Sequence, residues 1–136
     1  IAQMNAGEQQ EALATFREAM ELFPGNVALT VRYAETLMQV GEAKEAHTIL
    51  LELLNRVPPT LEQVRLIALA ANAAGDTADS YYYMAEYHAM SGSLRLALEQ
   101  LRLALSTPGL DNVDRARYTA RMEQFQGYLL AAEAQE

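Results

Sequence analysis

The 136-residue sequence contains no cysteine and no tryptophan, and it has only four prolines and seven glycines. Without cysteine, neither a disulfide nor a thiolate metal site can form. The scarcity of proline and glycine leaves long stretches without residues that interrupt helices. What remains is rich in Ala, Leu, Glu, Gln, Arg and Met, which enter helices at the lowest free-energy cost. The composition therefore predicts an all-α fold.

Basic residues are also scarce, because ten Lys and Arg stand against eighteen acidic residues, for a formal net charge of −8. Binding to phosphate depends on clustered basic side chains, so the composition argues against a nucleic-acid partner. The longest apolar stretch, residues 66–71, is too short to cross a bilayer. We expect a soluble protein without direct membrane insertion. The residues from Ile1 onward resemble the end of a helix that lacks a start signal, so we also expect a fragment of a longer protein.

Glycines recur at a fixed interval, at Gly7, Gly41 and Gly75. Other pairs keep this interval: Ala12 with Ala46, Phe16 with Leu50, Ala19 with Leu53, Pro24 with Pro58 and Ala34 with Ala68. A further copy, Gly92, Ala97, Leu101 and Ala104, follows the offsets of Gly7, Ala12, Phe16 and Ala19. The interval is the period of about 34 residues that is typical of tetratricopeptide repeats, whose unit is a pair of antiparallel helices. The sequence therefore resembles a tetratricopeptide solenoid.

Each recurring position has a mechanical reason. A glycine in the left-handed conformation can end the first helix of a pair, and we expect such turns at Gly7, Gly41, Gly75 and Gly92. The recurring alanines lie where two helices cross closely, so a larger side chain would overpack the crossing. Phe16, Leu50 and Leu101 lie four residues further along the same helix face. Pro24 and Pro58 then end the second helix.

This register predicts seven helices, at residues 8–22, 26–40, 42–56, 60–74, 77–91, 93–106 and 111–131, after a first helix that ends near residue 6. Thr60 with Gln63 resembles a capping box, and Thr77 and Asp111 are candidate N-caps. We expect one domain, made of a truncated repeat (1–25), a second repeat (26–59), an unpaired helix (60–76), a third repeat (77–109) and a C-terminal helix (110–136).

The period fails after Gly75, since Gly92 follows it at only half the repeat interval and Ala85 follows Ala68 at the same half interval. Half a repeat is missing at this point. We expect the regular superhelix to be interrupted there, with the C-terminal helices packing back to close a pocket.

In this architecture the first helix of each pair lines the concave groove that usually holds a partner, so its outward positions are the candidate binding residues. They are Arg32, Glu35, Met38, Gln39, Arg65, Leu69, Asn72, Tyr82, Tyr83, Glu86 and Met90. Arg32 and Arg65 could each grip a carboxylate with two hydrogen bonds, or could pair with the nearby Glu35 and Glu62.

Four tyrosines stand close together, at positions 81, 82, 83 and 87. Three consecutive helical residues spread over most of the circumference, so they cannot all be buried. We expect Tyr81 and Tyr87 in the core and Tyr82 and Tyr83 towards the groove.

No pattern of catalytic residues is present. The two histidines, His47 and His88, lie on different predicted helices without a ligand at helical spacing, so no metal site is expected. No HExxH motif, nucleophile elbow or phosphate loop occurs. We expect a chain that is not an enzyme and that binds proteins or peptides.

The C-terminal half resembles one family more specifically. Residues 71–76 read Ala-Asn-Ala-Ala-Gly-Asp, residues 85–87 read Ala-Glu-Tyr and lead to Gly92, and residues 115–121 read Arg-Ala-Arg-Tyr-Thr-Ala-Arg. With the half-repeat slip and residues 97–105, these segments are similar to the tetratricopeptide domain that ends the periplasmic β-barrel assembly-enhancing proteases, the BepA-like zinc metalloproteases.

This resemblance implies a periplasmic protein in which a preceding protease domain carries the zinc site, so that this chain itself needs no cofactor. It implies a role in recruiting substrates, with the barrel assembly machinery and unfolded outer-membrane proteins as partners. An alternative is a stand-alone tetratricopeptide adaptor for pilus or secretion-system assembly.

Overall fold

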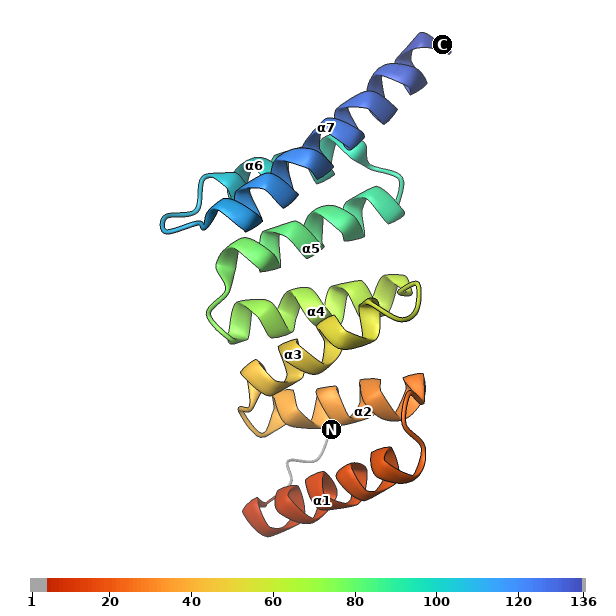
Figure 1. Ribbon diagram of the computed structural model, residues 1–136, viewed down its shortest axis with the longest axis vertical. Helices are drawn as coiled ribbons and strands as arrows, with labels where there is room; N and C mark the ends of the chain where they lie inside the picture. Colours follow the sequence, from red (N-terminus) through yellow and green to blue (C-terminus); the bar gives the residue numbers. More distant parts are fainter. Residues whose placement is uncertain (1–4, 136) are drawn as a thin grey trace. The chain divides into compact units, whose positions relative to one another are not determined.

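The computed structural model describes residues 5–135, and every regular element in that range is an α-helix. The seven helices are α1 (Ala6–Leu22), α2 (Val27–Gln39), α3 (Ala43–Leu54), α4 (Leu61–Ala73), α5 (Thr77–Met90), α6 (Leu94–Leu105) and α7 (Asn112–Ala134) (Figure 1). The all-α prediction is confirmed, and each expected helix is present within a few residues of its expected ends. Among the described residues, no helix combines the length and the apolar character needed to span a membrane.

The chain divides into two compact units, Ile1–Pro59 (unit 1) and Thr60–Glu136 (unit 2). In unit 1, α2 packs against both α1 and α3. In unit 2, each of α4, α5 and α6 packs against the next helix in the chain (Figure 1). Consecutive helices thus pack side by side as in a tetratricopeptide solenoid. The assignment of individual repeats to these helices stays a prediction.

Most helices begin with a side chain that caps the first turn. The N-cap residues Asn5, Asn26, Thr60, Asp76, Ser93 and Asp111 each accept a hydrogen bond from the backbone N–H three residues further on. Thr60 and Gln63 form the expected reciprocal capping box. The expected cap at Thr77 is wrong, because Asp76 caps α5 and Thr77 is its first helical residue.

Three glycines end helices in the same way. Gly41, Gly75 and Gly92 have φ angles of 86°, 88° and 90°. The N–H group after each glycine donates a 2.8 Å hydrogen bond to a carbonyl five residues earlier, at Leu37, Ala71 and His88. This is the Schellman arrangement, in which the left-handed residue is usually glycine. The turns at Gly41 and Gly75, one full repeat apart, and the turn at Gly92, half a repeat further, therefore have the same geometry.

Gly7 does not form the expected turn. It lies in the first turn of α1, where the Asn5 side chain accepts the N–H of Glu8 at 2.9 Å. The Asn5 cap therefore starts α1 before the glycine, and no helix end falls at Gly7. The rest of the expected preceding helix, residues 1–4, lies outside the described residues. The expectations missed two other left-handed glycines, Gly25 and Gly109, although both follow proline in a turn-forming Pro-Gly pair.

One hydrophobic cluster in the core of unit 2 is formed by α5, α6 and α7. It contains Ala78 and Ala85 of α5, Ala97, Leu98, Leu101 and Ala104 of α6, and Tyr118 and Phe125 of α7. The small side chains on α5 and α6 let these helices approach closely, while the rings of α7 fill the space beside them. Helix α7 is therefore an integral part of unit 2.

The core of unit 1 is built around α2. Tyr33, Ala34 and Leu37 are buried on this helix, and Leu13 is the buried residue of α1. On α3 the buried side chains are Ala46, Leu50 and Leu53. Helix α1 contributes little to the buried core, and much of its apolar surface remains open to solvent.

Candidate protein-binding site

A pocket of about 450 Å³ lies in unit 1, on the side of α2 that meets α1. Its lining consists of Phe16 from α1 and Arg32, Glu35, Thr36 and Gln39 from α2. The four α2 residues lie within two turns of one another at helical spacing, so they share one face of the helix. Three of the residues predicted to bind a partner, namely Arg32, Glu35 and Gln39, thus line one pocket.

The polar groups in this pocket are available to a partner. Arg32, Glu35 and Gln39 are exposed, and their side chains make no hydrogen bond or ion pair with any residue that the structure describes. The alternative pairing of Arg32 with Glu35 does not form. The pocket therefore offers a guanidinium, a carboxylate and an amide next to the ring of Phe16.

The backbone of α2 is held in place by a different set of contacts. The Tyr33 hydroxyl accepts a 3.0 Å hydrogen bond from Arg17 Nε of α1 and donates one of 3.0 Å to Glu45 Oε1 of α3. Burial raises the pKa of Tyr33, so this hydroxyl keeps its proton at neutral pH. The Phe16 and Tyr33 rings lie 6.2 Å apart between centroids. These contacts fix α2 relative to α1 and α3 without using Arg32 or Gln39.

The corresponding polar face of α5 in unit 2 is covered by α7. Arg121 forms a two-point ion pair with Glu86, through Nε to Oε1 at 2.6 Å and Nη2 to Oε2 at 2.9 Å. Arg117 pairs with the buried Asp79, which also accepts a 3.0 Å hydrogen bond from the Tyr118 hydroxyl. Glu86 therefore serves an internal contact, and its predicted role in partner binding is not supported by this geometry.

The tyrosines of α5 also pack inside unit 2. Tyr83 is only 8% exposed, so its expected place towards a groove is wrong. Tyr82 stacks on Tyr118 with ring centroids 5.1 Å apart, and the Arg117 guanidinium lies 4.6 Å from the Tyr82 ring centre. Tyr81 and Tyr87, expected in the core, are only partly buried. The sequence correctly predicted the helix that carries these tyrosines, but it could not show that α7 covers the face of α5 on which Tyr82 lies.

Burial controls the ionisation of this aromatic cluster. It raises the pKa of Tyr82 to about 12, with a further rise from the Glu86 carboxylate. Burial, followed by the charge of Asp79, also raises the pKa values of Tyr83 and Tyr118. All three hydroxyls therefore stay neutral over the physiological pH range.

The remaining predicted residues are scattered. Arg65, Leu69 and Asn72 are exposed along one face of α4, and Arg65 makes no ion pair with Glu62 or with any other described residue. Met90 is 47% exposed at the end of α5, and Met38 is partly buried in α2. Met38, the residue of this group that belongs to unit 1, does not line the pocket of that unit.

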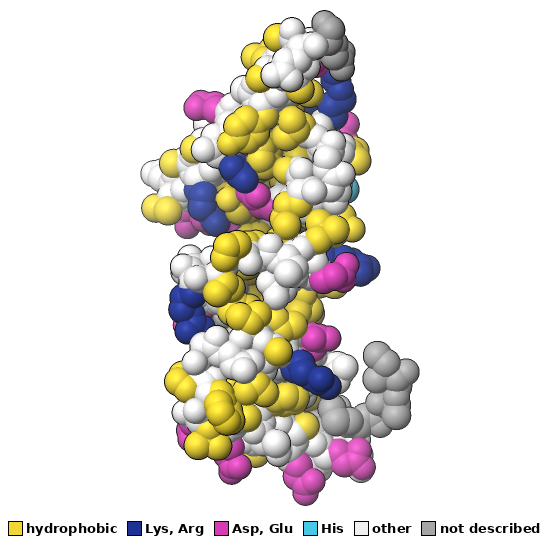
Figure 2. Space-filling view, turned by 90° about the vertical axis from the view of Figure 1, so that its right-hand side faces the viewer, with side chains coloured by type: hydrophobic (Ala, Val, Ile, Leu, Met, Phe, Trp, Pro, Cys, Tyr) yellow, Lys and Arg dark blue, Asp and Glu magenta, His cyan; other side chains and the backbone are white. Residues whose placement is uncertain are grey.

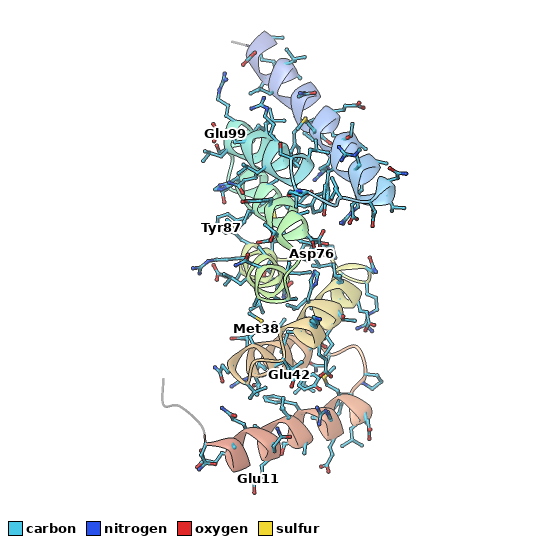
Figure 3. All side chains as sticks on the ribbon, turned by 90° about the vertical axis from the view of Figure 1, so that its left-hand side faces the viewer. Glu11, Met38, Glu42, Asp76, Tyr87 and Glu99 are labelled. Carbon is cyan, nitrogen blue, oxygen red and sulfur yellow. The ribbon has the colours of Figure 1, made fainter. Side chains whose placement is uncertain are left out.

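A second hollow, of about 300 Å³, lies in unit 2 beside the N-terminal ends of α5 and α7. Asp76, Asp111 and Asp114 contribute its carboxylates. Asp76, which Figure 3 labels at the start of α5, uses one oxygen to cap that helix, and Asp111 caps α7 in the same way. Asp114 pairs with Arg117 at 3.3 Å. These carboxylates already have structural roles, so the pocket of unit 1 is the better candidate site.

Charged side chains of both signs are interspersed on the face of each unit that Figure 2 shows, among hydrophobic and neutral polar groups. The net charge of the chain therefore does not describe the surface of the candidate site.

Comparison with known families supports the repeat assignment. Residues 4–72 match the model of the tetratricopeptide repeat, and the chain belongs to this family. No curated protein matches the sequence. Tetratricopeptide repeats form protein–protein interaction modules and are typically non-catalytic, so this chain is an interaction module.

Proposed function

We propose that unit 1 binds a protein partner in the pocket formed by Phe16 of α1 and by Arg32, Glu35 and Gln39 of α2. The observation that carries this proposal is the set of unpaired polar side chains around an open cavity. Its volume lies within the range of roughly 300–1,000 Å³ typical of ligand sites. A guanidinium beside an aromatic ring is typical of protein interfaces, where arginine and aromatic residues contribute strongly to binding.

Site-specific photocrosslinking in cells tests this site. A photoreactive amino acid replaces Gln39 in one variant and Glu99, an exposed residue on α6, in the control. We expect a discrete crosslinked protein from position 39 that is absent from position 99 and is reduced by the Arg32→Gln substitution. Equal labelling from both positions, insensitive to Arg32→Gln, would show that the pocket is not the binding site.

The finer proposal follows from the resemblance of residues 68–126 to BepA-like proteins. We propose that the chain is the accessory domain of a periplasmic zinc metalloprotease, where it recruits substrates during outer-membrane β-barrel assembly. On this proposal the barrel assembly machinery and unfolded barrel proteins are the partners, and the chain itself holds no cofactor. The run from Arg115 to Arg121 is the most specific part of this resemblance.

The identity of the crosslinked protein tests this finer proposal. Envelope proteins, above all components or substrates of barrel assembly, are the expected products from position 39. Cytosolic chaperones or components of a pilus or secretion system as the main products would contradict it, although the binding site in unit 1 would stand.

A further inference from the structure

The helix pair α1–α2 of unit 1 repeats the pair α6–α7 of unit 2 at one constant offset in the sequence. The matching positions are Ala12 with Ala97, Phe16 with Leu101, Ala19 with Ala104, Asn26 with Asp111, Arg32 with Arg117 and Tyr33 with Tyr118. The match has a structural counterpart, because Asn26 and Asp111 are both N-caps and both tyrosines are buried. Unit 2 is therefore an internal template for what packs on such a pair.

In unit 2, α5 covers the pair. Ala97, Leu101 and Ala104 of α6 are 0% exposed in a core that includes Ala78 and Ala85 of α5. On α7, Arg117 and the Tyr118 hydroxyl both bind the Asp79 carboxylate of α5. Helix α5 thus supplies small apolar side chains to the first helix of the pair and a carboxylate to the second.

In unit 1 the matching surface is open. Ala12, Phe16 and Ala19 are all partly exposed, and Phe23, one turn further along the same stripe, is 61% exposed. No carboxylate among the described residues pairs with Arg32, whereas its counterpart Arg117 binds Asp79, and the pocket lies between Arg32 and Phe16. The first helix of the corresponding pair in unit 2, α6, has this stripe buried. Helix α1 instead shows an apolar stripe that suits a covering helix.

We propose that this surface binds an α-helix of another protein, in the position that α5 holds against α6 and α7. The bound helix places small apolar side chains on Ala12, Phe16 and Ala19 and a carboxylate on Arg32. The inference rests on the proposed function of the pocket, and it adds the conformation and the chemistry of the partner.

The start of α1 favours a helix from a different molecule. The Asn5 side chain caps α1, and Gly7 is helical, so the chain does not enter α1 through the glycine turn that joins α5 to α6. Arg32, on the rim of the pocket, offers a positive charge to the carboxylate of the bound helix.

The test uses the full chain and a fluorescent peptide with the sequence of residues 76–92, which contains α5. We expect the peptide to bind, and we expect the Arg32→Gln substitution in the protein to weaken binding about tenfold, as for a lost charge-assisted contact. Arg65→Gln makes the same charge change on α4 and should leave the affinity unchanged. Asp79→Asn in the peptide should weaken binding as Arg32→Gln does, and the two changes together should cause little further loss.

Two matched variants test the helical contact itself. A peptide with Ala85→Pro keeps its charge but cannot form a continuous helix, so its binding should be lost. In the protein, Ala12→Glu should block binding, whereas Ala14→Glu, two residues away and outside the stripe, should not. Circular dichroism checks that both protein variants remain folded.

Several results would overturn the inference while leaving the proposed function in place. If the Ala85→Pro peptide binds as tightly as its parent, and still depends on Arg32, the pocket takes an extended chain. The same conclusion follows if no peptide binds while crosslinking from position 39 succeeds. If neither peptide binding nor crosslinking from position 39 is observed, the proposed function is contradicted as well.

Other occupants of the surface give distinct results, each of which would also overturn the inference. Concentration-dependent dimerisation that Ala12→Glu abolishes would identify a second copy of the chain. Residues 1–136 contain no cysteine, so Ala12→Cys gives this chain a single thiol for labelling. Protection of that thiol in the full-length protein without any partner would show that a segment of the same protein covers the stripe.

Discussion

Helices α2 and α5 present polar side chains at similar spacing, but they use them differently. On α5, Asp79 and Glu86 pair with arginines of α7, and Tyr82 stacks on Tyr118. On α2, Arg32, Glu35 and Gln39 surround a pocket, and their side chains pair with no residue in the described range 5–135. A polar helix face is therefore available to a partner only where no neighbouring helix of the same unit covers it.

The largest effect that sharpens this comparison is expected at Phe125 of α7. This ring is 1% exposed, and the Phe125→Ala substitution should lower the free energy of unfolding by about 3–5 kcal/mol. Tyr128→Ala, in the same helix but at a residue 54% exposed, should change it far less. Urea denaturation followed by circular dichroism measures both. A small effect at Phe125 would mean that α7 is not part of the folded core.

A second substitution separates the roles of the two polar faces. Asp79→Ala leaves Arg117 and Tyr118 without their shared partner and should destabilise the protein by about 3 kcal/mol. Arg32→Ala on α2 removes no side-chain hydrogen bond or ion pair among the described residues, so the free energy of unfolding should stay within about 0.5 kcal/mol of the parent. Thermal or urea unfolding measures the stability of both variants. Similar losses of stability in the two would contradict the distinction between a structural and a binding face.

The aromatic cluster of unit 2 predicts a loss of stability at alkaline pH. The pKa of Tyr82 is about 12 in the folded chain against roughly 10 in an unfolded one. The folded state therefore holds the phenolic proton more tightly, and its stabilising contribution is complete below about pH 10 and is lost as the pH rises towards 12. Urea midpoints measured from pH 8 to 12 should fall in this window. The urea midpoint of the Tyr82→Phe variant should fall less between pH 8 and 12. An identical fall in both proteins would show that ionisation of Tyr82 is not the cause.

A smaller effect distinguishes two glycines that the repeat period treats as equivalent. Gly75 has φ 88°, so Gly75→Ala should cost about 1–2 kcal/mol. Gly7 lies within α1, and Gly7→Ala should stabilise the protein by up to about 1 kcal/mol because alanine has the higher helix propensity. Thermal unfolding compares the two variants. Destabilisation by Gly7→Ala of the same size would show that Gly7 forms a turn after all.

The sequence predicted the helices because their signals are local. The repeat period, the caps at Thr60 and Asp111 and the Gly75 turn are each carried by short stretches of residues, and the sequence predicted each of them. The Gly7 turn was wrong because a local competitor, Asn5, caps the helix first. The half-repeat spacing correctly pointed to two equivalent turns at Gly75 and Gly92.

The candidate site was only partly predictable, since burial by a distant helix leaves no local signal. The register placed Arg32, Glu35 and Gln39 correctly on one face of α2. It also placed Tyr83 and Glu86 on an open face, because nothing near them in the sequence shows that Arg117 and Arg121 of α7 occupy it. A comparison of charges could have suggested this, since α7 carries two arginines one turn apart and α5 carries two carboxylates two turns apart.

We propose that the open face of α2, and not the covered face of α5, receives the partner. The most direct measurement compares photocrosslinking in cells from Gln39 on α2 with that from Met90, the exposed predicted residue on α5. The account predicts a strong adduct at position 39 that Arg32→Glu abolishes, and little labelling at position 90. A strong adduct at position 90, together with a weak one at position 39 that ignores Arg32→Glu, would contradict it.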